Sequence, residues 1–176
     1  KVIFSKWRPV ELQMNYVEYP VQVGRYGNGS NYGAIQHAKK KQAIDIVMTK
    51  PTEKFLIFVH DKNTGRSVIT MLKENGITAE FHNADLDREE RREIEDSFKQ
   101  RQGGLRVMIS TSSCAYGLNM PARNVIIVGV HRSIEDVDKV DIIQEIGRCG
   151  RVGIDDAGYA YMIIPEGSTE SWKSII

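Results

Sequence analysis

Residues 55–60, FLIFVH, form an unbroken apolar run that ends in a polar residue. Such a run is typical of a strand buried on both faces of a parallel sheet, whereas a strand with one wet face alternates apolar and polar residues. Similar strand-like segments recur along the chain, at ITAEFH (77–82), LRVMIS (105–110), NVIIVGV (124–130) and GYAYMII (158–164). They predict several strands of one sheet.

Helix-like periodicity separates these strands. A first helix runs from about residue 34 and ends before Pro51, because the residue before a proline is disfavoured in a helix. A second helix stops at Gly76, a charged third helix covers about 87–102, and a fourth ends near Arg151. Strands that alternate with helices predict an α/β fold in which an open parallel sheet is flanked by helices.

Residues 1–33 are predicted to be a linker segment with short strands, followed by a domain at 34–176. Pro9 and Pro20 restrict the segment to edge or connecting positions, because proline cannot donate a ladder hydrogen bond. The chain begins with Lys1 rather than methionine, and we interpret it as a piece of a longer protein.

The composition is that of an ordinary globular domain, with 176 residues, 27% charged residues and a net charge of +1. A nucleic-acid partner would therefore have to meet a local basic patch. No apolar run approaches the length of a membrane-spanning helix, and Cys114 and Cys149 lack the spacing of a metal or redox site. We expect an intracellular protein, cytoplasmic or nuclear, with no membrane partner and no metal ligands of its own.

Residues 21–33, VQVGRYGNGSNYG, have the glycine content of a phosphate-binding loop. That loop requires a lysine and a hydroxyl residue after its second glycine, because these side chains reach the phosphates and the magnesium ion. Ser30 and Asn31 occupy those positions here, and the glycine spacing of a dinucleotide-binding loop also fails. The segment is therefore interpreted as a connecting loop that binds no nucleotide.

Polar residues follow several predicted strands directly, in DKNTGR (61–66), TSSCAYGLN (111–119) and HRS (131–133). The carboxyl ends of parallel strands share one edge of a wound sheet, where ligands usually bind. Hydroxyls, amides and cations at this edge suit the phosphates of a nucleic-acid backbone. Alternatively, the same residues serve only as helix caps.

The segment 141–153, DIIQEIGRCGRVG, carries the sharpest polar pattern. On a helix, Gln144, Arg148 and Arg151 would share one face. Two guanidiniums directed at one point can neutralise the charge that develops on a transferring phosphoryl group. Alternatively, arginines near the end of a helix simply offset its macrodipole.

Three consecutive lysines occupy positions 39–41 within the first predicted helix. Runs of lysine usually form a solvated helix face. We interpret them in this way, with a binding role as the less favoured alternative.

The segment QEIGRCGR (144–151) resembles motif VI of the superfamily-two helicases. STSSCAYGLNMPARNVII (110–127) resembles their motif V in the form used by the superkiller-like branch, which includes archaeal repair helicases. KFLIFVHDK (54–62) is similar to motif IV, and WRPVEL (7–12) to the segment that leads into the domain in that branch. The motifs occur in the family order and span nearly the whole chain.

The resemblance implies the second RecA-like lobe of an ATP-driven helicase or translocase. The Walker lysine and the magnesium-binding carboxylates belong to the first lobe of such a chain, so ATP and Mg²⁺ would be bound mainly there, and this chain alone is expected to be inactive. Arg148 and Arg151 would reach the γ-phosphate as catalytic residues, with Gln144 as a nearby sensor. Gly117 and Asn119 would approach the nucleotide.

The resemblance also implies contacts to a DNA or RNA backbone, expected to be single-stranded. Thr111 and Ser112 would hold a phosphate, and Lys62 and Arg66 are further candidates for backbone contacts. The resemblance assigns no role to three polar residues after the strand at 77–82, namely His82, Asn83 and Asp85.

Two alternatives remain open from the sequence. The chain is a nucleic-acid-binding module that has the fold without motor chemistry, or part of a translocase that remodels junctions without unwinding duplex. The sequence decides neither between DNA and RNA nor the direction of movement, the pathway or the oligomeric state.

Overall fold

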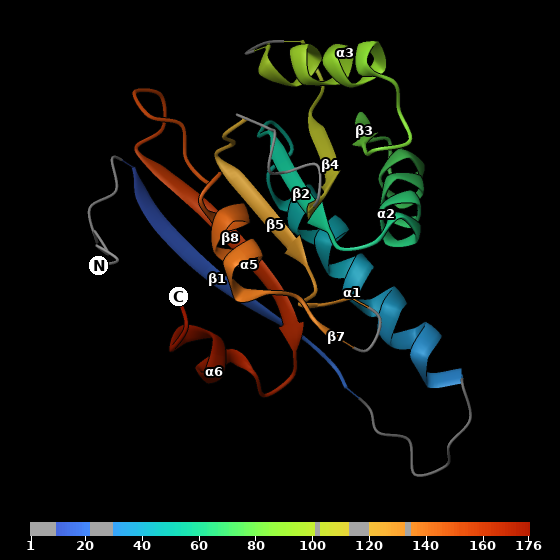
Figure 1. The fold of residues 1–176 in the computed structure, drawn as a ribbon, viewed down its shortest axis with the longest axis vertical. Helices are drawn as coiled ribbons and strands as arrows, with labels where there is room; N and C mark the ends of the chain where they lie inside the picture. The colour runs from blue at the N-terminus through green and yellow to red at the C-terminus, as the bar shows by residue number, and fades with distance from the viewer. Residues whose placement is uncertain (1–9, 22–29, 101–102, 113–119, 133–134) are drawn as a thin grey trace.

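A six-stranded sheet in which all neighbouring strands are parallel forms the centre of the molecule (Figure 1). The computed structural model describes residues 10–21, 30–100, 103–112, 120–132 and 135–176. The strand order is β1-β8-β5-β2-β4-β3, so β1 and β3 form the edges. The strands are β1 (Glu11–Tyr19), β2 (Phe55–Val59), β3 (Ala79–His82), β4 (Val107–Thr111), β5 (Asn124–Val128) and β8 (Ala157–Pro165). The parallel sheet confirms the predicted fold class.

Helices cover both faces of this sheet, and a short antiparallel pair, β6 (His131–Arg132) and β7 (Glu135–Asp136), lies outside it. The helices, labelled as in Figure 1, are α1 (Ser30–Thr49), α2 (Lys62–Glu74), α3 (Arg88–Lys99), α5 (Lys139–Ile146) and α6 (Thr169–Lys173). None of these described helices is long and apolar enough to cross a membrane.

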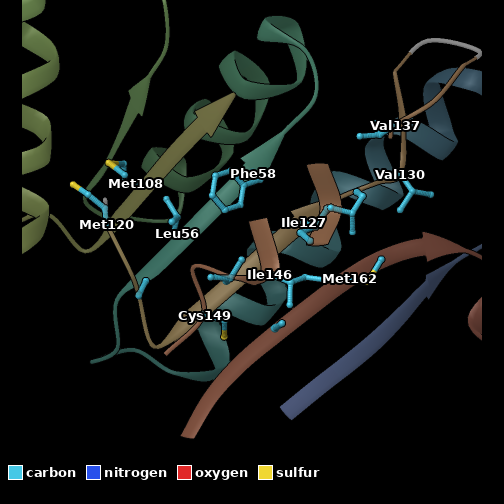
Figure 2. Packing of buried hydrophobic residues seen from close by; sticks show 14 of the residues in the cluster. Leu56, Phe58, Met108, Met120, Ile127, Val130, Val137, Ile146, Cys149 and Met162 are labelled. Atoms are coloured by element: carbon cyan, nitrogen blue, oxygen red, sulfur yellow. The ribbon is translucent and has the colours of Figure 1, made fainter. Parts of the chain in front are cut away.

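Strand β2 explains why residues 55–60 contain no polar alternation. Phe55, Ile57 and Val59 belong to an apolar cluster that α1 and α2 cover. Leu56 and Phe58 point to the opposite face, into a cluster that α3 and α5 complete (Figure 2). Both sets are fully buried, as predicted for a central parallel strand.

Strand β1 is the part of residues 1–33 that joins the sheet. It pairs with β8 along its whole length, from Glu11 opposite Ala157 to Tyr19 opposite Pro165. Pro20 follows the strand, in agreement with an edge position. The domain division at residue 33 stays a prediction.

Residue Arg106 joins the sheet to the end of α1. Its Nη2 donates to the carbonyl oxygens of Val47 at 2.7 Å and Lys50 at 2.9 Å, and its Nε donates to that of Glu53 at 3.4 Å. Carbonyl groups at the end of a helix have no partner within the helix. Arg106, which is far from α1 in the sequence, donates the hydrogen bonds that satisfy these carbonyl groups.

Replacing Arg106 with methionine keeps the aliphatic stem and removes these donors. We expect the free energy of unfolding in urea to fall by about 1.5–3 kcal/mol, the range for hydrogen bonds that involve a charged group. The control is Arg92→Met on the exposed side of α3, which should change it by no more than about 0.5 kcal/mol. Equal effects of the two variants would contradict this role of Arg106.

Candidate functional site

A cavity of about 480 Å³ lies at the amino-terminal edge of the sheet. Lys54 precedes β2, Pro121 precedes β5, and a loop with Arg148 and Arg151 precedes β8. With Lys99 from the end of α3, four of the lining residues are cationic, and none of the described lining residues is acidic. The cavity is therefore suited to an anion.

The two arginines lie on a loop and not on the predicted helix. Helix α5 ends at Ile146, and Gly147 is its C-cap. The predicted arrangement of Gln144, Arg148 and Arg151 on one helical face is therefore wrong. Both arginines line the cavity, whereas Gln144 lies exposed on α5 and is not among the lining residues.

The arginine loop is attached to the sheet by its backbone. Cys149 pairs with Ala122 in a parallel bridge. The N–H of Ala122 donates to the carbonyl of Arg148 at 3.0 Å, and the N–H of Gly150 donates to the carbonyl of Ala122 at 2.8 Å. The Cys149 side chain is buried in the apolar cluster beside the sheet (Figure 2). A residue fixed in the core thus separates the two arginines and limits the movement of both.

Arg151 is oriented by Asp155, whose side chain is 2% exposed. Nε and Nη2 of Arg151 donate to the two carboxylate oxygens at 2.9 and 2.8 Å, and its backbone N–H donates to Asp155 Oδ2 at 2.8 Å. Burial opposes the ionised form of Asp155, but the hydrogen bonds from Arg151 outweigh it, so the pKa of Asp155 lies below its ordinary value of 3.8. The sequence analysis did not identify Asp155.

Lys54 adds a further constrained cation to the cavity. Its Nζ donates to the carbonyl of Phe98 at 2.8 Å and lies 5.4 Å from the centroid of the Phe98 ring. Burial, and secondly the charge of Arg151, lower the pKa of Lys54. An anion in the cavity would offset both effects. Lys54 stands next to FLIFVH, but the sequence contains no sign that it faces the arginines.

Gly117 and Asn119 lie outside the described residues. Met120 and Pro121, which follow them directly, line the cavity.

The predicted nucleic-acid contacts lie at the carboxyl edge of the sheet. Thr111 ends β4, and Thr111 and Ser112 are buried, 6% and 2% exposed. Ser112 Oγ lies 2.7 Å from His60 Nδ1, and His60 Nε2 lies 2.8 Å from the carbonyl oxygen of Gly129. His60 thus links the ends of three neighbouring strands, β4, β2 and β5, and was not identified from the sequence.

Lys62 and Arg66 share one carboxylate, that of Asp85. Lys62 Nζ binds Asp85 Oδ1, and Arg66 Nη2 binds Asp85 Oδ2 at 3.2 Å. All three side chains are exposed. The neighbouring Asn83 accepts a hydrogen bond from the backbone N–H of Asp85 at 3.0 Å and so fixes this turn.

His82 makes a separate contact nearby. Its Nε2 lies 3.0 Å from Glu95 Oε1 of α3. Of the three polar residues without an assigned role, Asp85 pairs with two cations, Asn83 holds the turn and His82 faces α3.

The two groups lie at opposite edges of the sheet. The five residues of β2 separate Lys54 from His60 by roughly 20 Å, given a rise of about 3.3 Å per residue. In the sequence, residues 111–121 run from the end of β4 to the arginine cavity. The chain thus presents one cationic surface at each edge.

Comparison with known proteins identifies the family of the chain. The helicase conserved C-terminal domain matches residues 38–153. The ATP-dependent DNA helicase Hel308 of Pyrobaculum calidifontis is 40% identical over 88 residues, which is 47% of this chain and 12% of the relative. Hel308 of Thermoplasma volcanium is 32% identical over 71% of the chain and 18% of the relative. The pre-mRNA-splicing factor brr2 of Schizosaccharomyces pombe is 26% identical over 98% of the chain and 10% of the relative.

Solved structures show the same fold. The C-terminal domain of the DEAD-box protein Dbp5 has a TM-score of 0.72 at 21% identity, over 95% of this chain and 83% of that domain. The chain belongs to the helicase conserved C-terminal domain family and is a second RecA-like lobe of the superkiller-like branch of superfamily two. It spans only about an eighth of the first Hel308 relative.

Replacing Asp155 with asparagine removes the carboxylate that orients Arg151. We expect the free energy of unfolding to fall by about 1–3 kcal/mol at pH 7. The control is Asp156→Asn at the next residue, where the side chain is 88% exposed and a loss of no more than about 1 kcal/mol is expected.

The effect of Asp155→Asn should depend on pH. A carboxylate with a lowered pKa stabilises the folded state above its unfolded pKa and loses this effect as the pH falls through its folded pKa. The difference between wild type and variant should therefore narrow as urea unfolding is measured below pH 3.8. A difference that stays constant down to pH 2, about two units lower, would contradict the ion pair.

Proposed function

We propose that the chain is the second motor lobe of an ATP-dependent nucleic-acid helicase or translocase, and that Arg148 and Arg151 complete an ATP site shared with the first RecA-like lobe of the same protein. The observation that carries this proposal is the cavity with four cationic and no acidic lining residues among those described. The names of the relatives, among them ATP-dependent DNA helicases, support it.

The side chains of the cavity fit the phosphates of ATP and do not fit Mg²⁺. Guanidinium and ammonium groups bind phosphate oxygens, whereas Mg²⁺ takes carboxylate, phosphate and water oxygens. Within the described ranges, no cluster of three His, Cys, Asp or Glu residues is placed to hold a metal ion. We therefore assign Mg²⁺ mainly to the first lobe and to the nucleotide.

Orientation is the main contribution of this chain to hydrolysis. ATP supplies the phosphoryl group, and negative charge develops on its oxygens as the group is transferred. Asp155 binds Nε and Nη2 of Arg151, and the bridge at Cys149 holds the backbone between the two arginines. Donors fixed before the reaction stabilise developing charge without reorganisation. We assign Gln144 a sensor role, and Gly117 and Asn119 an approach to the nucleotide.

The opposite edge is proposed to bind a DNA or RNA backbone, single-stranded where the motor steps. Thr111 and Ser112 would contact one phosphate, and Lys62 and Arg66 the backbone beside it. Contacts to phosphate do not depend on base sequence, which movement along a strand requires. Binding at one edge and hydrolysis at the other would be linked through residues 111–121.

The two arginines are tested in the full-length protein that contains this chain. Arg148→Gln and Arg151→Gln should each lower kcat of the nucleic-acid-stimulated ATPase by about 10³- to 10⁵-fold, the range for arginine fingers. Affinity for a single-stranded oligonucleotide should be unchanged, because the arginines lie at the other edge of the sheet. The control is Arg92→Gln on the exposed side of α3, which should retain full activity.

Undiminished ATPase activity of the Arg148→Gln, Arg151→Gln double variant would refute the proposed ATP site. Wild-type protein that binds nucleic acid without any ATPase activity would favour the binding module. ATPase activity without strand displacement would indicate a translocase that does not unwind. The chain by itself should not hydrolyse ATP.

Replacing Asp85 with asparagine tests the other edge, since it releases Lys62 and Arg66 from their shared carboxylate. Affinity for single-stranded DNA and RNA should rise about 2- to 5-fold at low salt, because exposed ion pairs contribute up to about 1 kcal/mol. The control is Asp45→Asn, which removes an exposed carboxylate from Lys41 on α1 and should leave affinity unchanged. Weaker binding by Asp85→Asn would contradict contacts through Lys62 and Arg66.

A further inference from the structure

A second cavity, of about 560 Å³, opens at the carboxyl edge of the sheet. Its lining includes Lys39 of α1, Asp61 and Thr64 at the start of α2, and His131 of β6. Asp61 is the single acid among its described lining residues. The resemblance to helicases assigned no role to Lys39 or to this cavity.

Lys39 is the unusual member of the lysine triplet. It is 7% exposed, so the interpretation of residues 39–41 as a solvated face is wrong at this position. Lys40 donates to Ser67 Oγ at 2.9 Å, and Lys41 donates to Asp45 Oδ2 at 2.6 Å. Within the described residues, by contrast, no hydrogen bond or ion pair engages the ammonium group of Lys39. Most of the side chain is buried, but the ammonium nitrogen is not among the buried atoms that lack a partner, so it reaches the surface of the cavity, where a ligand can supply an acceptor.

Gly129, after β5, makes room for this lysine. A Cβ atom at position 129 would lie 2.9 Å from Lys39 Cδ and 3.1 Å from its Nζ, and the residue has a φ of +86°. The backbone conformation therefore favours glycine, and a Cβ atom here would displace the end of the Lys39 side chain. The carbonyl of Gly129 contacts His60, which contacts Ser112. Lys39 is thus connected through packed groups to the predicted phosphate contacts of β4.

Asp61 does not neutralise Lys39 through a direct contact. Its carboxylate caps α2 and accepts hydrogen bonds from Thr64 N at 2.8 Å and Thr64 Oγ1 at 2.7 Å. Burial lowers the pKa of Lys39, and the charge of Asp61 opposes this shift only in part. An anion with free oxygens would complete the surroundings of the ammonium group.

We propose that the Lys39 cavity binds a backbone phosphate of the nucleic-acid strand, beside the phosphate assigned to Thr111 and Ser112. This inference rests on the proposed function. The ends of β4 and β5 are two strand positions apart in the sheet, or roughly 10 Å, so one strand can reach both sites.

A nucleic-acid strand fits the rim of the cavity better than a free phosphate ion does. Tyr32 lines the cavity and is 63% exposed. An exposed aromatic ring beside a buried cation provides a surface on which a base can stack while the adjoining phosphate is bound. A free phosphate ion would make no use of this ring.

The test replaces Lys39 with methionine in the full-length protein and measures binding of single-stranded deoxythymidine and uridine oligonucleotides over a series of salt concentrations. We expect affinity at low salt to fall about 10-fold, as for the loss of a charged hydrogen bond. The slope of log affinity against log salt should decrease by about 0.7, the value for one phosphate contact to a single strand. The control is Lys41→Met, which removes the same charge from the exposed side of α1.

A second variant avoids any change in the buried lysine. Gln36 lies on the rim, one turn before Lys39. The variant Gln36→Glu introduces a carboxylate that would bind Lys39 and repel phosphate, and it should weaken oligonucleotide binding without lowering the melting temperature. Its control is Gln13→Glu, at an exposed position of β1 outside this cavity.

Each outcome decides the inference. Unchanged affinity and salt slope in both Lys39→Met and Gln36→Glu, with wild-type binding intact, would overturn the inference and leave the proposed function standing. If Lys39→Met weakens only the binding of inorganic phosphate and leaves oligonucleotide binding unchanged, the proposed contact with a nucleic-acid strand is overturned in favour of a free anion. Absence of nucleic-acid binding by the wild type would overturn both proposals.

Discussion

Parallel pairing throughout the central sheet places all strand starts at one edge and all strand ends at the other. Loops that enter the sheet and loops that leave it therefore form two separate surfaces. The loop that carries Arg148 and Arg151 directly precedes β8, and Lys54 directly precedes β2. Both therefore lie at the amino-terminal edge of the sheet. His60 and Thr111 belong to the opposite edge. The separation of two cationic surfaces in one domain follows from the direction of the strands.

Within each surface, carboxylates determine how the cations are presented. The buried carboxylate of Asp155 holds Arg151 in one orientation. The exposed carboxylate of Asp85 instead pairs with two cations, Lys62 and Arg66. The buried pair is shielded from solvent and fixes geometry, whereas the exposed pairs are screened by salt and exchange easily with phosphate. Under the proposed function, the fixed arginine at the amino-terminal edge would suit transition-state stabilisation, and the exposed ion pairs at the carboxyl edge would suit successive contacts along a strand.

Much of the fold was predictable from the sequence because its strands are uniformly apolar. Residues 55–60 contain β2, residues 105–110 contain all of β4 except its last residue, Thr111, and α2 ends just before Gly76, as predicted. The end of α5 was not predictable in the same way. The sequence analysis extended this helix to about Arg151, whereas α5 ends at Ile146 with Gly147 as its C-cap, and the loop that follows is bridged to the distant Ala122 through Cys149.

The candidate site, like the fold, was predictable only in part. The resemblance identified Arg148 and Arg151 as a pair, and the structure places both at one cavity. Asp155, Lys54 and Lys39 carry no comparable sequence signal, because an aspartate or a lysine in a polar segment is usually solvated. Their burial results from contacts between elements far apart in the chain, which periodicity does not report.

Gly158 in β8 shows how far the arginine loop depends on the sheet beneath it. A Cβ atom at this position would lie 2.7 Å from the backbone nitrogen of Gly150 and 2.9 Å from Cys149 Sγ. Even a single methyl group there would push against the segment that joins the two arginines. A larger residue at position 158 should consequently displace the loop that carries Arg148 and Arg151, although glycine itself offers no side chain to any ligand.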